Sequence, residues 1–107
     1  MILKVKPLSV NEAWQGRRFK TEKYISYEEI LLYMLPKIQV PAGKLKLKIV
    51  FGMSSKASDI DNPVKPFIDI LQKKYGFNDK NIYKLEVEKQ DVEKEQEFTE
   101  FELTGDN

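Results

Sequence analysis

Carboxylates around residue 60 are the side chains best suited to chemistry in this 107-residue chain, because the sequence has no cysteine and no histidine. Thiolate nucleophiles, cysteine zinc sites and histidine-based catalytic groups are therefore excluded. Asp59 and Asp61 lie two residues apart, and in an extended segment this spacing directs both carboxylates to one side. Asp61, Lys65 and Asp69 follow at helical spacing, so we expect them on one face of the next helix.

This cluster of acids admits two interpretations. Two carboxylates about 4 Å apart repel each other by about 4 kcal/mol at an effective dielectric constant of about 20, so a close pair needs a cation or a proton. A hard divalent cation such as Mg²⁺, or Mn²⁺ in its place, prefers such oxygen ligands. Alternatively, Asp61 caps a helix, Asp59 forms a turn, and Lys65 pairs with Asp69 on an exposed surface. The spacing alone leaves both interpretations open.

The elements that must position these side chains follow from hydrophobic periodicity and from glycine and proline signals. One helix is predicted between a cap at Thr21 and a stop at Pro36, and a second is predicted from a cap at Asp61 or Asn62 to Gly76. Residues 9–20 show no sustained period, so we expect an irregular arm there. The predicted strands are Ile2–Lys6, Leu45–Met53, Ile82–Lys89 and Glu95–Leu103, the last two forming a closing hairpin.

The pattern predicts one α+β domain over residues 1–107, with both helices on one mixed sheet in the order β-α-β-α-β-β. The second helix should bury Val64, Phe67, Ile68 and Leu71. Pro66 lies beyond the expected first turn, so an irregular helix start is predicted. Lys44, Lys46 and Lys48 alternate with apolar residues, which we interpret as edge protection or solvation rather than a DNA track.

Charge is distributed unevenly along the chain. Residues 1–85 hold 16 Lys/Arg against 8 Asp/Glu, whereas residues 86–107 hold 2 against 9. The first part has the sign needed to face a polyanion, although an ordinary solvated surface with an acidic last hairpin explains the same numbers. The sequence has neither an apolar run long enough to span a membrane nor a signal-peptide pattern, so we expect a cytoplasmic protein without a membrane partner.

Two separated motifs resemble the RusA-type Holliday junction resolvases. The run Asp59-Ile60-Asp61-Asn62, with Lys65, Pro66 and Asp69, and the later run Asn78-Asp79-Lys80-Asn81-Ile82 are similar to the family's acidic signature. The run Pro7-Leu8-Ser9-Val10-Asn11, with Trp14, Gly16, Arg17 and Arg18, resembles the family's opening motif, and Lys89 matches in the strand that follows. One departure is Asn78, where the family often has a first aspartate.

The resemblance implies a small homodimeric endonuclease that cleaves four-way DNA junctions by symmetric nicking with Mg²⁺. Such enzymes are often encoded by prophages, which implies a bacterial or phage protein. By position, Asp59, Asp61 and Asp79 match the family's essential acids, which would hold the metal, and Lys65 matches its essential lysine. Asp69 matches a recurrent acid without an assigned role.

Contact with DNA is expected from the N-terminal arm. Arg17, Arg18 and Lys20 would bind phosphates, and Trp14 and Phe19 would stack on opened bases. A solvated loop anchored by Trp14 is the alternative interpretation.

The position of Asp79 leaves the composition of the site open. A helix from Asn62 to Tyr75 is about 20 Å long, so Asp79 comes far from Asp61 unless the chain runs back alongside the helix. Otherwise Asp79 completes the site of a partner subunit, which is the arrangement we favour. Two other functions also remain open: a nucleic-acid-binding module without catalysis, and a protein-interaction domain that docks a basic partner on residues 86–107.

Overall fold

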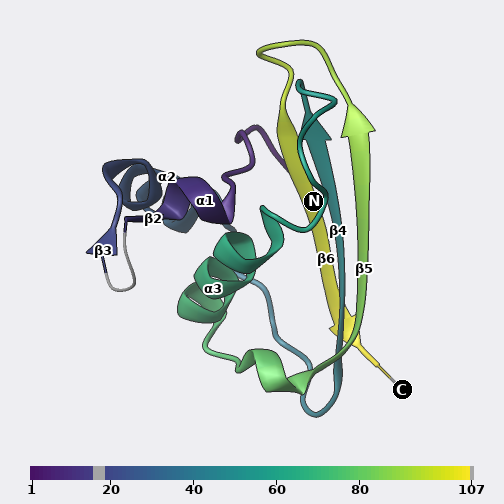
Figure 1. The fold of residues 1–107 in the computed structure, drawn as a ribbon. Helices are drawn as coiled ribbons and strands as arrows, with labels where there is room; N and C mark the ends of the chain where they lie inside the picture. Colours follow the sequence, from purple (N-terminus) through teal and green to yellow (C-terminus); the bar gives the residue numbers. More distant parts are fainter. Residues whose placement is uncertain (16–18, 107) are drawn as a thin grey trace.

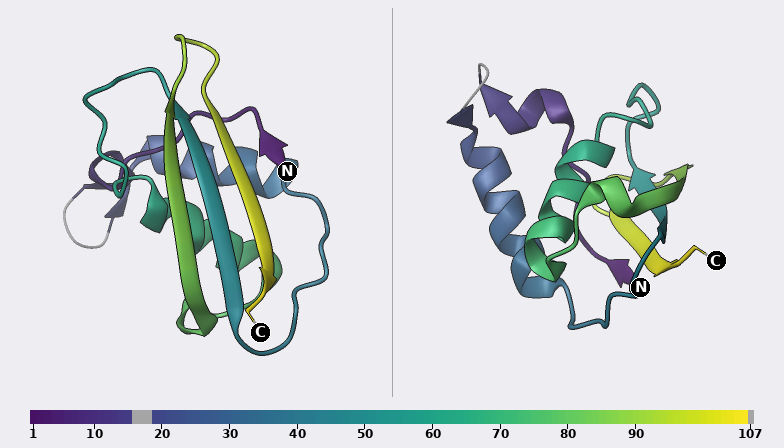
Figure 2. Two further views of the ribbon diagram at one scale, coloured as in Figure 1. Left: turned by 90° about the vertical axis from the view of Figure 1, so that its right-hand side faces the viewer. Right: turned by 90° about the horizontal axis from the view of Figure 1, so that it is seen from below.

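The fold is built around strand β4 (Leu45–Met53), which is buried along most of its length. In the computed structural model, which describes residues 1–15 and 19–106, β4 lies between a parallel strand, β5 (Ile82–Asp91), and an antiparallel strand, β6 (Phe98–Gly105). Figure 1 shows β6, β4 and β5 side by side. Strand β1 (Ile2–Leu3) pairs with β6 and completes the order β1-β6-β4-β5 (Figure 2, left). The expected α+β class with a mixed sheet is confirmed.

Helices cover one face of this sheet in the described part of the chain, and the other face carries none (Figure 2, left). They are α1 (Val10–Ala13), α2 (Glu22–Met34), α3 (Val64–Tyr75) and a short 3₁₀ helix, η1 (Asp79–Asn81). Two short strands, β2 (Trp14–Gln15) and β3 (Phe19–Lys20), pair with each other. The expectation of an irregular arm over residues 9–20 is therefore wrong where the chain is described. None of the described helices has the length and hydropathy needed to cross a membrane.

The predicted closing hairpin is also wrong, because β5 and β6 flank β4 instead of pairing with each other. Val50 on the outer face of β4 is buried, like the residues of the inner face, which agrees with the position of β4 between two strands. The lysines of β4 therefore do not protect an edge. Lys46 lies 3.5 Å from Glu86, and Lys48 is in register with both Glu86 and Glu102. The lysines thus offset much of the acidic charge of β5 and β6.

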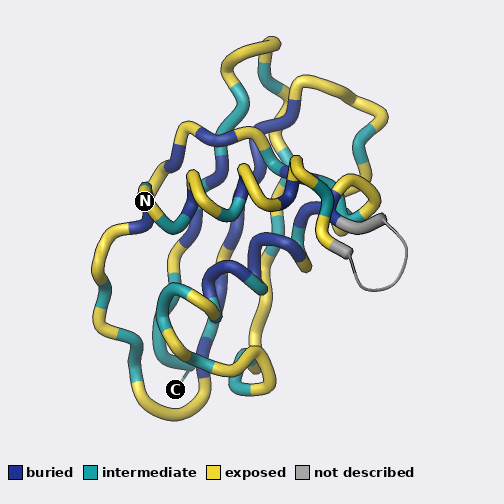
Figure 3. Tube along the Cα trace, turned by 90° about the vertical axis from the view of Figure 1, so that its left-hand side faces the viewer, coloured by how far each residue is buried: buried dark blue, intermediate teal, exposed yellow. Residues whose placement is uncertain are grey.

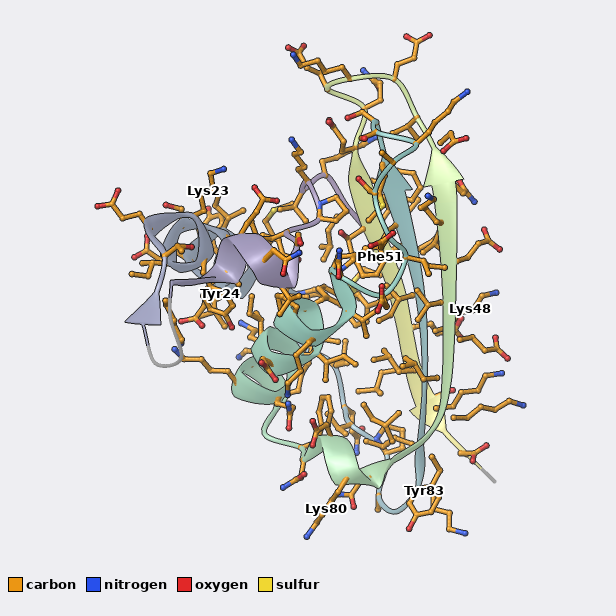
Figure 4. The ribbon with its side chains drawn as sticks, in the orientation of Figure 1. Lys23, Tyr24, Lys48, Phe51, Lys80 and Tyr83 are labelled. Atoms are coloured by element: carbon orange, nitrogen blue, oxygen red, sulfur yellow. The ribbon has the colours of Figure 1, made fainter. Side chains whose placement is uncertain are left out.

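The two faces of β4 have different partners. Figure 4 shows Lys48 projecting from the bare face and Phe51 projecting toward α3. The ring of Phe67 on α3 makes edge contacts with Phe51 (6.1 Å between centroids) and with Phe101 of β6 (5.7 Å). Buried positions therefore lie between the helices and the sheet (Figure 3). Other fully or nearly fully buried members of this core are Tyr24, Leu31, Leu47, Ile49, Ile70 and Leu71.

The ends of α2 agree with the prediction, whereas the start of α3 does not. The Thr21 hydroxyl accepts a hydrogen bond from the Tyr24 amide (3.1 Å), as expected of an N-cap. Helix α3 begins at Val64 after a buried Pro63, and neither Asp61 nor Asn62 caps it through a side chain. Pro66 consequently lies in the first turn, where its missing N–H costs no helical hydrogen bond. Gly76 ends the helix with φ 74°, as predicted.

An ion-pair cluster at Glu28 joins α2 to α3 and to the N-terminal arm. The Glu28 carboxylate, with its side chain only 14% exposed, lies 2.7 Å from Lys73 of α3 and 3.4 Å from Lys20 of β3. Burial alone would raise the pKa of Glu28, but the hydrogen bond from Lys73 and the charge of Lys20 lower it below its ordinary value. The ionised form therefore stabilises the folded state.

Replacing Glu28 by Gln should lower the free energy of unfolding by about 1–2 kcal/mol near pH 7, a typical contribution of hydrogen bonds between charged groups. Because the folded-state pKa is lowered, this stabilisation is present above the unfolded-state pKa and is lost as the pH falls through the folded-state pKa. The difference from wild type should thus vanish below about pH 3. Urea unfolding near pH 7 and below about pH 3 measures this difference in the free energy of unfolding.

The neighbouring Glu29, which is exposed, provides the matched control. Glu29→Gln should change the free energy of unfolding by less than about 0.5 kcal/mol at either pH. If Glu28→Gln lowers the free energy of unfolding equally at both pH values, the charge of the carboxylate does not contribute to stability.

Candidate active site

A groove of about 350 Å³ between α3 and β5 brings together three of the predicted site residues. Asp61 precedes α3, Lys65 lies in its first turn, and Asp79 opens η1. The floor is aliphatic and is formed by Ile60, Val64, Ile68, Leu85 and Val87. Asp79 reaches this groove because the chain reverses after Gly76 and η1 lies against α3, where the Asp79 amide donates a hydrogen bond to Gln72. A single chain thus brings Asp79 beside Lys65 by running back alongside the helix, which is the first of the two arrangements considered. No partner subunit is needed for this contact.

Lys65 forms the electrostatic centre of this groove. Its ammonium lies 2.7 Å from Asp69 Oδ1 and 3.6 Å from Asp79 Oδ2. The hydrogen bond to Asp69, together with the charges of Asp69 and Asp79, raises the pKa of Lys65 above its ordinary value. The groove therefore contains a positive charge held by carboxylates, and its position is set by the i, i+4 spacing on α3.

Gln72 is a positioning residue that the sequence analysis missed. Its Oε1 accepts a hydrogen bond from the Asp79 amide (2.8 Å), and its Nε2 donates one to Asp69 Oδ1 (3.4 Å). Gln72 thus connects α3 to the turn that carries Asp79. The signal was present in the spacing, since Gln72 follows Lys65 by seven residues and Asp69 by three on the same helix face.

Asn78 supports Asp79 from the other side. The Asn78 side chain accepts a hydrogen bond from the Lys80 amide (3.0 Å) and so caps η1. An asparagine oxygen caps about as well as an aspartate oxygen. The local turn is consequently compatible with Asn78, and Asp79 remains the carboxylate that faces the groove.

Asp59 does not face the same groove as Asp61, so the prediction of two carboxylates on one side is wrong. Asp59 lines a neighbouring cavity of about 250 Å³ together with Ser9 and Asn62. The chain bends at residues 60–61, where an extended segment was assumed, and the Asp61 carbonyl then accepts a hydrogen bond from the Val64 amide (3.1 Å). Asn62 Nδ2 also lies 3.5 Å from Asp59 Oδ2.

The two motif blocks, about 50 residues apart in sequence, meet at this turn. The Val10 amide donates a hydrogen bond to the Asn62 carbonyl (2.9 Å). Pro7 and Ser9 line the cavity that also contains Asp59. The opening motif therefore packs directly against the acidic motif in the folded chain.

Lys89 holds the loop that leads to Asp59. Its ammonium donates hydrogen bonds to the Ser58 carbonyl (2.8 Å) and the Lys56 carbonyl (3.4 Å). Residues 54–58 lie between β4 and the acidic turn, and this lysine comes from the adjacent strand β5. A charged donor to two carbonyls fixes the path of an otherwise exposed loop.

The predicted DNA-contact residues are only partly described. Arg17 and Arg18 lie outside the described residues, as do the side chains of Trp14 and Phe19. The backbone of Trp14 pairs with that of Lys20 across β2 and β3. The Lys20 ammonium is directed back to the protein, 3.4 Å from Glu28 and 5.0 Å from the centre of the Tyr24 ring.

Carboxylate oxygens are ligands that suit Mg²⁺, but Asp59 lines one cavity and Asp61 and Asp79 line another. Within residues 1–15 and 19–106, no three acidic side chains converge in a way that would hold a metal ion. Asp61 and Asp79 share a groove, however, and Mg²⁺ commonly uses one or two protein carboxylates together with water and substrate phosphate. Asp59 would join such a set only through a change in the bend at residues 60–61.

Replacing Lys89 by Met should loosen the loop at residues 54–60 while leaving the sheet intact. The loss of charged hydrogen bonds to two carbonyls should raise amide hydrogen exchange in this loop by about tenfold. Hydrogen-exchange mass spectrometry resolves this segment. Lys84→Met, on the opposite face of the same strand, should leave the loop unchanged, and equal exchange in wild type and Lys89→Met would show that Lys89 does not hold the loop.

The chain was compared with models of protein families and with curated proteins. No family model matches the chain, and no curated protein matches it.

Proposed function

We propose that this protein is a Mg²⁺-dependent, structure-specific endodeoxyribonuclease that resolves four-way DNA junctions by nicking phosphodiester bonds symmetrically. The observation that carries the proposal is the contact between the two RusA-like motif blocks, which meet through the hydrogen bond from Val10 to Asn62. Residues that share one site must be close in space, and a chance resemblance of two short motifs would not require this.

Carboxylates and a lysine suit phosphodiester hydrolysis in a chain without histidine. Asp61 and Asp79 are the residues that would hold Mg²⁺, with Asp59 as a third ligand after local movement of its turn. When bound, the ion supplies a hydroxide nucleophile near neutral pH and stabilises charge on the phosphoryl group.

The protein's own residues orient the scissile phosphate. Lys65 presents a positive point charge to the groove, where it can neutralise phosphate charge as it develops. Asp69 holds the Lys65 ammonium in place, and Gln72 fixes the backbone at Asp79. A phosphate that enters the groove would compete with Asp69 and Asp79 for Lys65.

Symmetric nicking determines the rest of the proposal. A four-way junction has two equivalent strands to cut, and one chain of this size supplies one such groove, so the active form is a homodimer. The setting that fits this activity is the cytoplasm of a bacterium, with the protein encoded by the host or by a phage. DNA contact by Trp14, Arg17, Arg18, Phe19 and Lys20 belongs to the same proposal.

Asp61→Asn tests the proposal with little risk to the fold. Asp61 is exposed and its side chain does not cap α3, so the thermal midpoint should change by less than about 3 °C. Cleavage of a four-way junction with Mg²⁺ should fall by about 10³-fold or more, as expected when a metal ligand is lost. Junction binding without metal should be as tight as wild type or tighter, because one charge that repels phosphate is gone.

Asp91→Asn is the matched control, since Asp91 is an exposed carboxylate at the opposite end of β5 from Asp79. It should cleave and bind like wild type. Normal cleavage by Asp61→Asn would rule out Asp61 as a metal ligand, and unfolding of this variant would show a structural role instead.

A further inference from the structure

Aliphatic side chains remain exposed in the groove between α3 and β5, beside its charged residues. Ile60 is 42% exposed and Leu85 is 45% exposed, and both line this groove together with Lys65. Removal of aliphatic surface from water is favourable, so a ligand that covers these side chains gains affinity. A Mg²⁺ ion and a phosphate are polar and would leave them uncovered. The groove therefore offers a contact that the proposed metal and phosphate chemistry does not use.

The exposure of Leu85 results from its place in the sheet. Leu85 is in register with Leu47 of β4, so the two side chains lie on the same, helix-covered face. Leu47 has no exposed surface, whereas Leu85 belongs to the last strand of the sheet (Figure 1). The described helices thus cover Leu47 and leave Leu85 open.

Ile60 is exposed for a different reason. It lies at the bend of residues 60–61, between Asp59 and Asp61. Asp59 lines the neighbouring cavity, whereas Ile60 and Asp61 line the groove. The bend thus places an aliphatic side chain next to a carboxylate that would hold Mg²⁺, where the substrate must come close.

A DNA strand has an apolar part that fits such a surface. The flat faces of its bases are apolar, but in an unbroken duplex each face is covered by the neighbouring base pair, and only the base edges are accessible. Exposing a base face in a duplex therefore requires unstacking, which costs free energy. At the branch point of an open four-way junction, stacking between the arms is already interrupted, so this cost is smaller.

We propose that Ile60 and Leu85 contact the face of an unstacked base at the branch point, next to the phosphate bound at Lys65, and so direct cleavage to junctions. This inference rests on the proposed nuclease function and adds the residues that distinguish a junction from a duplex. The groove joins both contacts, because it holds Lys65 and Asp79, 3.6 Å apart, together with the two aliphatic side chains. Aliphatic contact with a base face does not read the donors and acceptors of the base edges, so it selects structure rather than sequence.

Removing the base and removing the side chains together test this contact. The substrates are a four-way junction with all its bases and the same junction with abasic nucleotides at the branch point. With Mg²⁺, the value of kcat/KM on the complete junction should be about tenfold lower for Ile60→Ala/Leu85→Ala than for wild type. On the abasic junction the two proteins should agree within about twofold. An equal loss on both junctions would overturn the proposal, because the side chains would then act on something other than the base.

Dissociation constants measured in EDTA give a second readout that needs no cleavage. The double variant should bind the complete junction about tenfold more weakly than wild type, and it should bind the abasic junction and a matched duplex like wild type. If wild type shows this binding pattern but nicks no junction, the nuclease function fails and the base contact is retained. If wild type nicks junctions and the double variant binds and nicks them equally well, the base contact fails and the nuclease function is retained.

Two controls exclude indirect effects. Ile2→Ala removes a side chain that is 59% exposed on β1, at the opposite edge of the sheet, and should cleave and bind like wild type. Because Ile60 and Leu85 are exposed, the double variant should keep its thermal midpoint within about 3 °C of wild type. By light scattering it should also keep the oligomeric state of wild type. A change in that state would place the two side chains in a subunit interface and overturn the proposal.

Discussion

The burial of β4, complete on its helix-covered face and extending to Val50 and Gly52 on the other face, is the constraint from which the rest of this structure follows. Strand β4 lies inside the sheet, with β5 on one side and β6 on the other. The parallel pairing of β4 with β5 requires a crossover, and α3 supplies it. That crossover returns the chain along α3 and brings Asp79 within 3.6 Å of Lys65, although 14 residues separate them.

The charged residues of the groove are therefore held in place by the hydrophobic packing of α3 on the sheet. The apolar side of α3 fixes the helix against Phe51 and Phe101, and this leaves the Lys65–Asp69–Gln72 face directed at the turn before β5. Lys89 and the Val10–Asn62 contact position the neighbouring loop and turn from two other directions. Asp59 and Asp61 thus lie on the loop before α3, and Asp79 lies on η1.

Helices and strands with a strong hydrophobic period were predictable from the sequence, whereas the pairing of the strands was not. The α2 boundaries followed from Thr21 and Pro36, and the C-terminus of α3 followed from Gly76. The closing hairpin was wrongly predicted because adjacency in sequence was taken for adjacency in the sheet, whereas β4 lies between β5 and β6. The Asp59–Asp61 pair was misplaced because period-two reasoning assumes an extended chain, and the chain bends at residues 60–61 instead. The Lys65–Asp69 pair was predictable, since a helix fixes it locally.

The most direct measurement is a cleavage assay of the wild-type protein on a labelled four-way junction, a matched duplex and a matched single strand, each with and without Mg²⁺. If Asp61, Lys65 and Asp79 form a nuclease site, the junction alone should be nicked, at symmetric positions in two strands and only with the metal. Binding to the junction without nicking would contradict catalysis and leave a nucleic-acid-binding module. Absence of salt-dependent binding to any of the three DNAs would contradict the account as a whole.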